Sequence, residues 1–258
     1  MKQNILISIW KQSLKQFLIY RSTSLITFLL ALIFLVIQLL IGDVYFGEGI
    51  KINGWSKEEY FILITFCYSA EYLYNFFFVL GHENMSEAIL NGELDYALIR
   101  PISSYWYIVG TNLDIPSFFN FLVSYGLLLH YLSAVHTSWL VVIEIFFYLL
   151  CAALFLFFIN QICICLTFWF DGLTAVYGMI EDLWDFASRP KTIFPRAIQN
   201  LFIFIFPVLI ATNLPLAFAI QHHWGSEMVI YFLFSLIVLY FISKIVWEKG
   251  LKHYASSN

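Results

Sequence analysis

Two pairs of polar side chains are spaced so that they could bind a charged molecule among apolar neighbours. Glu71 and Asn75 are four residues apart in one segment, and Glu181 and Asp185 are four apart in another. Residues at this spacing share one face of a helix, so each pair would present a polar patch that could line a substrate path. For Glu71 and Asn75 the alternative is hydrogen bonding between helices or burial against a partner subunit. For Glu181 and Asp185 it is a solvated cytoplasmic loop.

The sequence gives little support for a metal site or for a reactive cysteine. The six histidines show no metal-binding spacing with cysteines or carboxylates, and His82-Glu83 lacks the second histidine of an H-E-x-x-H motif. The four cysteines lie within apolar runs, where packing is the expected role. We therefore expect no metal site and no cofactor held by this chain.

The composition identifies the environment in which these residues must work. The 258 residues are 61% hydrophobic and only 12% charged, and the mean hydropathy is +0.81. Soluble domains carry about 25% charged residues. Each apolar run is long enough to cross a bilayer, which takes about 17–25 residues. The six runs are Leu25–Ile41, Tyr60–Leu80, Ile115–Leu132, Trp139–Phe168, Leu201–Ile220 and Met228–Val246. The sequence predicts one all-α membrane domain, residues 1–258, with six transmembrane helices and no nucleic-acid partner.

Residues 1–22 are predicted to form an interfacial helix, and no cleavable signal peptide is expected. Ser8, Lys11 and Lys15 recur at helical spacing on one side, with Ile9 and Trp10 opposite. A basic amphipathic helix with an aromatic edge lies in the headgroup layer of membrane lipid. The alternative is a cytoplasmic extension of the first span. Either arrangement puts the N-terminus inside.

Lysine and arginine near the span ends predict the orientation. The loop between the first two runs holds only Lys51 and Lys57, together with four acidic residues. The other Lys and Arg residues fall on the opposite side: Lys2, Lys11, Lys15, Arg21, Arg100, Arg189, Lys191, Arg196, Lys244, Lys249 and Lys252. Positive loops face the cytoplasm, so both termini are predicted to be cytoplasmic.

The polar segment after the second run has the features of a docking element. A short helix from about Glu83 to Leu90 is expected, ended by Asn91-Gly92 as a left-handed cap. Beyond it, charged residues alternate with Leu94 and Leu98. The segment is longer than a tight connector, which favours docking of a cytoplasmic partner over an ordinary loop.

The same segment resembles a known family. GELDYALIRPIS is similar to the G-x-L-D-x-x-L-x-R-P segment of bacterial ABC-2 type transporter permeases. The stretch from Arg189 to Phe218 is similar to that family's run of spaced prolines, here Pro190, Pro195, Pro207 and Pro215. WEKGLKHYASSN resembles its closing pattern, here Trp247, Gly250, Leu251, Tyr254 and Ser256.

The resemblance implies a transmembrane subunit with a type V exporter-like bundle. Such subunits pair with a second permease subunit, identical or different, and rest on two cytoplasmic ABC ATPase subunits through a coupling helix after the second span. Residues 81–104 would form this coupling loop. The residues expected to contact the ATPase are Glu87, Gly92, Leu94, Asp95, Leu98, Arg100 and Pro101. The sequence contains no G-x-x-x-x-G-K-[ST] phosphate loop, so ATP and magnesium would be held by the partner ATPase.

The resemblance conflicts with the charge pattern over the fifth crossing. In the family arrangement Gly172–Ser188 would cross, and residues 190–220 would be a proline-broken, re-entrant outer segment. The charge pattern instead makes Leu201–Ile220 the crossing and keeps Arg189 inside. In the first case Glu181 and Asp185 of two subunits would form a ring of carboxylates that favours a cationic or amphipathic substrate.

The function expected from the sequence is the permease half of an ATP-driven exporter in a bacterial plasma membrane. Its substrate would be a drug, an antimicrobial peptide or a lipid-like molecule, moved by alternating access. The alternatives are a membrane-embedded enzyme and a passive channel or scaffold. The first would need paired catalytic groups on facing helices, and the second would work without an ATPase.

Overall fold

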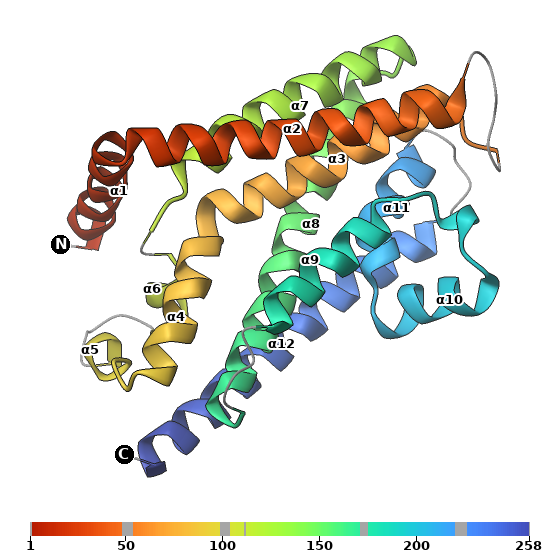
Figure 1. Ribbon diagram of the computed structural model, residues 1–258. Coiled ribbons are helices and arrows are strands. Elements are labelled where there is room, and N and C mark those ends of the chain that lie inside the picture. The colour runs from red at the N-terminus through yellow and green to blue at the C-terminus, as the bar shows by residue number, and fades with distance from the viewer. Residues whose placement is uncertain are drawn as a thin grey trace.

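The computed structural model describes residues 2–47, 54–98, 104–110, 112–170, 175–219 and 226–257, and their regular secondary structure is helical. The helices form an elongated bundle with both termini towards one end (Figure 1). Phe46, at the end of α2, and Lys57, at the start of α3, lie at the other end. We call the end that holds the C-terminus and α4–α6 the coupling end, and the opposite end the loop end.

The N-terminal helix α1 (Lys2–Ile19) lies at an angle to α2 (Arg21–Phe46). It is held by Ser13, which is 4% exposed and accepts a hydrogen bond from the backbone N–H of Leu113. Trp10, Leu14 and Leu18 are exposed. The ring of Phe17 also packs on that of Phe119, and the interfacial placement of α1 stays a prediction.

The centre of the bundle is α3 (Lys57–Tyr74), which is buried along nearly all its length and packs between α7 and α8. Its first turn is a capping box: Ser56 accepts from the Glu59 N–H, and the Glu59 carboxylate accepts from the Ser56 N–H. The helix continues through a π-helical segment η1 (Asn75–Val79) into α4 (Leu80–Leu90). The path bends there (Figure 1), and π-helical turns of this kind often occur at functional sites.

The segment after α4 folds back as predicted from Asn91-Gly92. Gly92 has a φ of 72°, its N–H bonds to the Ile89 carbonyl, and the Glu93 N–H bonds to the Ala88 carbonyl. These are the two bonds of a Schellman motif, which requires the left-handed conformation that glycine adopts without strain. Two short helices follow, α5 (Asp95–Leu98) and α6 (Ser104–Val109).

Two long helices and the C-terminal helix complete the body. They are α7 (Ile115–Ala134), α8 (Trp139–Cys165) with the 3-10 turn η2 (Leu166–Phe168), and α12 (Ser226–Ser257). Gly250 of α12 lies directly against Phe168, where a Cβ would be only 2.1 Å from the ring. Trp247 and Tyr254 also pack on Phe168. Trp247, Gly250 and Tyr254, which belong to the closing pattern of the sequence, therefore pack α12 against the end of α8.

The helix α9 (Ala175–Ala187) runs from the coupling end towards the loop end (Figure 1). Just before it, Trp169 stacks on His253 near the C-terminus. Just after it, Arg189 and Pro190 line a cavity with Tyr45 and Tyr60 at the loop end. The three segments that follow, η3 (Lys191–Ile193), α10 (Arg196–Asn200) and η4 (Leu201–Ile205), stay at that end and lead into α11 (Val208–Ala219).

Five helices among the described residues are long and apolar enough to cross a membrane: Arg21–Phe46, Lys57–Ile89, Ile115–Ala134, Trp139–Phe168 and Glu227–Tyr254. A sixth is reached if the pair Arg196–Ile205 and Val208–Ala217 counts as one span, but the two helices meet at 101°. The predicted all-α membrane bundle is confirmed. Leu201–Ile220, however, is not one straight helix, because the chain turns at Phe206-Pro207 and proline cannot donate the backbone bond that would continue it.

The position of Arg189 bears on the conflict between charge pattern and family arrangement. The charge pattern groups Arg189, Lys191 and Arg196 with Arg100 and the C-terminus. In the structure Arg189 lies at the loop end, where it lines a cavity with Tyr45 and Tyr60. The family arrangement expects Arg189 at the end opposite the C-terminus, but a crossing by α9 stays a prediction, because this helix of 13 residues is not among the candidate spans. Residues 172–174, which begin the predicted crossing Gly172–Ser188, lie outside the described residues.

Candidate functional site

A cavity of about 340 Å³ lies over the C-terminal turns of α3, and it brings together the four polar residues singled out from their spacing. Glu71 and Asn75 come from α3 and η1, and Glu181 and Asp185 come from α9. The remaining wall is formed by α2 and the first turns of α7. The other lining residues are Thr27, Ala31, Phe34, Gln38, Tyr68, Tyr72, Asp114, Pro116, Ser117 and Asn120.

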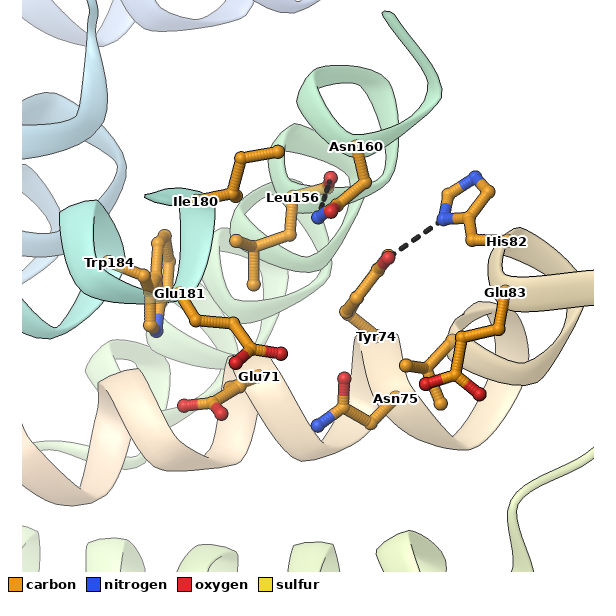
Figure 2. A pocket seen from close by; sticks show the side chains of 11 residues that line it. Glu71, Tyr74, Asn75, His82, Glu83, Leu156, Asn160, Ile180, Glu181 and Trp184 are labelled. Carbon is orange, nitrogen blue, oxygen red and sulfur yellow. Dashed lines mark hydrogen bonds between the residues drawn. The ribbon is translucent and has the colours of Figure 1, made fainter. Parts of the chain in front are cut away.

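A second cavity of about 190 Å³ adjoins the first, because Glu71, Asn75 and Glu181 line both. Figure 2 shows the Glu71 and Glu181 side chains side by side, one from α3 and the other from α9. Asn160 of α8 lines this second cavity as well, and its Nδ2 donates to the Leu156 carbonyl at 2.9 Å. The polar groups of three helices therefore face one connected space.

Two sets of hydrogen bonds hold α9 over the cavity. Trp184 is 2% exposed, and its indole N–H donates to the Cys67 carbonyl of α3 at 3.3 Å. At the C-terminus of α9, Thr212 Oγ1 and Asn213 Nδ2 donate to the Ala187 carbonyl at 2.7 and 3.1 Å. Asn213 also donates to the Arg189 carbonyl and accepts from the Lys191 N–H. A helix end leaves carbonyls without partners, and α11 satisfies them here.

The first turn of α7 adds a fourth carboxylate, Asp114. Burial raises its pKa above the ordinary value, and the hydrogen bond from Ser117 partly offsets this effect. The backbone N–H of Asp114 donates to the Phe76 carbonyl in η1 at 3.0 Å. This bond ties the start of α7 to the π-helical segment, where the bend leaves a carbonyl available.

The charge of the larger cavity has one sign. Glu71, Asp114, Glu181 and Asp185 line it, and no lysine or arginine is among its described lining residues. Arg189 follows Asp185 by four residues and lines a neighbouring cavity at the loop end, from which its positive charge acts on Asp185. Carboxylates that line one cavity repel one another, and a bound cation relieves that repulsion.

Two other intramembrane polar residues, Gln161 and Glu144, line neither cavity. Gln161 Oε1 bonds to His82 Nε2 at 2.9 Å, and His82 Nδ1 bonds to the Tyr74 hydroxyl at 2.7 Å. Glu144 accepts from Tyr148 on its own helix. Gln161 is thus used for packing between helices, whereas Glu71 and Asn75 face the cavity.

Asn120 is a lining residue that the sequence analysis did not single out. It lies on the face of α7 that carries Ser117 and Ser124, and Ser124 bonds to Ser69 of α3 at 3.0 Å. The spacing of 117, 120 and 124 places three polar residues on one face of an apolar helix. This pattern is the feature of the sequence from which Asn120 could have been identified.

The predicted coupling residues lie at the coupling end, and they differ in accessibility. Glu87, Gly92 and Asp95 are exposed, and Leu98 is 37% exposed. Leu94 is fully buried, so it anchors the turn rather than forming part of its surface. Arg100 and Pro101 lie outside the described residues.

Comparison with known proteins adds the family. Residues 28–258, which hold the cavity and the coupling end, match the family model described as ABC-2 family transporter protein. Searches of curated proteins and of solved structures found no match. Members of this family are membrane subunits of ABC transporters that work with ABC ATPases and are not themselves enzymes. The chain therefore belongs to the ABC-2 family of transporter proteins.

Proposed function

We propose that this chain is the permease subunit of an ATP-driven ABC exporter in a bacterial plasma membrane, and that its substrate passes through the carboxylate-lined cavity. The observation that carries the proposal is the meeting of Glu71, Asn75, Glu181 and Asp185 in one cavity between α3 and α9. Ionisable groups at this depth are costly, so a cavity that collects several of them is best explained by a polar passenger.

The proposed mechanism is alternating access in a dimer of permease subunits, identical or different. ATP binds to the partner ATPase subunits, which press on the α4–α5 segment at the coupling end. Because α4 continues α3 through η1, a displacement of α4 is transmitted to the residues at the bend, Glu71 and Asn75. The substrate, a drug, antimicrobial peptide or lipid-like molecule, would leave at the loop end.

The proposal predicts the loss of a partner when the exposed acidic residues of the coupling end are reversed. Glu87→Lys combined with Asp95→Lys is expected to lower the amount of ABC ATPase retained by the tagged permease by roughly fivefold or more, since charge reversal at an interface opposes association. The retained chain is identified by its phosphate-loop sequence. Glu58→Lys is the matched control, because Glu58 is equally exposed at the loop end. Equal retention in all three proteins would contradict this docking site.

The membrane orientation has its own test. Ile193 is 49% exposed at the loop end, and Lys252 is exposed at the coupling end. In intact cells, Ile193→Cys is expected to react with a membrane-impermeant maleimide, whereas Lys252→Cys should react only after permeabilisation. The unmodified chain is the background control, because Cys67, Cys151 and Cys165 are buried and Cys163 is half-buried. The opposite labelling pattern would reverse the proposed direction of the subunit.

Transport itself is tested by reconstitution of the permease in vesicles with and without its ATPase. Uptake into inside-out vesicles that needs both the ATPase and ATP is the expected result. Flux without the ATPase would favour a passive channel. Chemical change of the substrate by the permease alone would favour a membrane-embedded enzyme.

A further inference from the structure

The cavity contains a buried hydrogen-bond acceptor without a partner. Asn120 is 2% exposed, it lines the cavity, and its side-chain oxygen Oδ1 makes no hydrogen bond. Leaving a buried polar group unsatisfied costs about 1–3 kcal/mol. Such a group in a native protein calls for an explanation, and a bound ligand is one.

The chemistry of the lining narrows what that ligand must be. The carboxylates of Glu181 and Asp185, when ionised, can only accept hydrogen bonds. Asp114 already accepts from Ser117, and the Tyr72 hydroxyl already donates to the Ala31 carbonyl of α2. The cavity thus offers negative charge and free acceptors together. A ligand that matches it carries positive charge and N–H donors on the same group.

We propose that the substrate is a cation bearing N–H groups, an ammonium or a guanidinium, and that Asn120 Oδ1 accepts a hydrogen bond from it while the carboxylates compensate its charge. A quaternary ammonium has the same charge but no N–H, so it would leave Asn120 Oδ1 buried and unpaired. Sites built to hydrogen-bond a ligand reject analogues that lack the bonding group. That the bound cation is transported rests on the proposed function; that it binds does not.

The remaining wall sets the size and shape of the cation. Phe34, Tyr68 and Tyr72 contribute aromatic rings, which attract cations through their faces. The volume of about 340 Å³ accommodates one aromatic ring with a short aminoalkyl chain. A 2-phenylethyl group carrying different nitrogen substituents is therefore a suitable probe.

The test measures binding by calorimetry to the full chain in lipid nanodiscs, at neutral pH and without the ATPase. The probes are 2-phenylethylammonium and its N,N-dimethyl and N,N,N-trimethyl derivatives. The dimethyl probe keeps one N–H and is nearly as large as the trimethyl probe, so it separates hydrogen bonding from size. The dimethyl probe is expected to bind about tenfold more tightly than the trimethyl probe, the loss that one unpaired buried acceptor produces.

Two variants assign that preference to its residue. Asn120→Leu, which is similar in volume, is expected to abolish the difference between the dimethyl and trimethyl probes. Its thermal stability should not fall, because Asn120 Oδ1 makes no hydrogen bond to lose. Glu144→Gln is the control on α8 away from the cavity, and it should bind all probes as the unmodified chain does.

The outcomes distinguish this inference from the proposed function. Equal binding of the dimethyl and trimethyl probes, absence of binding, or a preference that survives Asn120→Leu would overturn the assignment of an N–H cation. A chain that shows the preference but neither retains an ATPase nor transports would overturn the proposed function and leave the binding site standing.

Discussion

Replacing Glu181 by Gln and Asp185 by Asn in one chain is expected to reduce ATP-driven transport of 2-phenylethylammonium by about tenfold or more. The reason is that a cation which leaves water for the interior of a membrane protein needs compensating charge. Without that charge, moving a charged group to this depth costs several kcal/mol on insertion scales. Both carboxylates line the cavity from α9. The measurement is uptake into vesicles that contain the permease and its ATPase.

Asp182, the third acidic residue of α9, provides a control. Asp182 is exposed and lies between the other two in the sequence, but it lines neither cavity. Asp182→Asn should therefore transport at the normal rate. All variants should retain the ATPase, because Glu87 and Asp95, the exposed residues predicted to contact it, are unchanged in them. Undiminished transport in the double variant, or an equal loss in Asp182→Asn, would remove the carboxylates from the substrate path.

Gly81→Ala is expected to lower the stability of the folded chain. Among the helical glycines that pack against backbone atoms, Gly81 is the one at which an added methyl group should cost the most. A Cβ at Gly81 would lie 2.1 Å from the Val109 carbonyl oxygen and 2.6 Å from two other backbone atoms of Val109. Backbone cannot move aside as a flexible side chain can, so α4 and α6 must separate. Overpacking costs about 1–3 kcal/mol, which exceeds the roughly 1 kcal/mol that alanine gains over glycine in a helix.

The matched control is Gly126→Ala in α7, where a Cβ would meet nothing within 4 Å. That variant should melt at the same temperature as the unmodified chain or higher, while Gly81→Ala melts lower. Thermal unfolding of the purified chain, followed by tryptophan fluorescence, gives both values. Because α4 leads to the coupling end, Gly81→Ala should also retain less ATPase. Equal melting temperatures for the two variants would show that the contact between α4 and α6 is not tight.

The sequence predicts the membrane helices well because their signal is local. A run such as Trp139–Phe168 is apolar throughout and appears as one continuous helical span. The left-handed cap at Gly92 is equally local, since it depends on one glycine after one helix. The spacing of four residues is also local. It places Glu71 with Asn75, and Glu181 with Asp185, on one helix face without any knowledge of the tertiary structure.

What the sequence does not reveal depends on contacts between distant segments. The bend between Arg196–Ile205 and Val208–Ala217 is hidden because both arms are apolar and the run reads as one span. The meeting of α3 with α9 depends on the bond from Trp184 to Cys67, residues 117 positions apart. Asn120 could be noticed as polar, but its missing partner is visible only when α2, α3 and α7 are assembled around it.

The cap that α11 provides for α9 has a consequence for biogenesis. The carbonyl groups of Ala187 and Arg189 find their partner in Asn213, which follows them by 26 and 24 residues. Synthesis proceeds from the N-terminus, so α9 emerges before the residues that complete its end. Its acidic face and open C-terminus leave it poorly suited to membrane insertion alone. We therefore expect the helix that carries the cavity carboxylates to reach its final position only after α11 has been made.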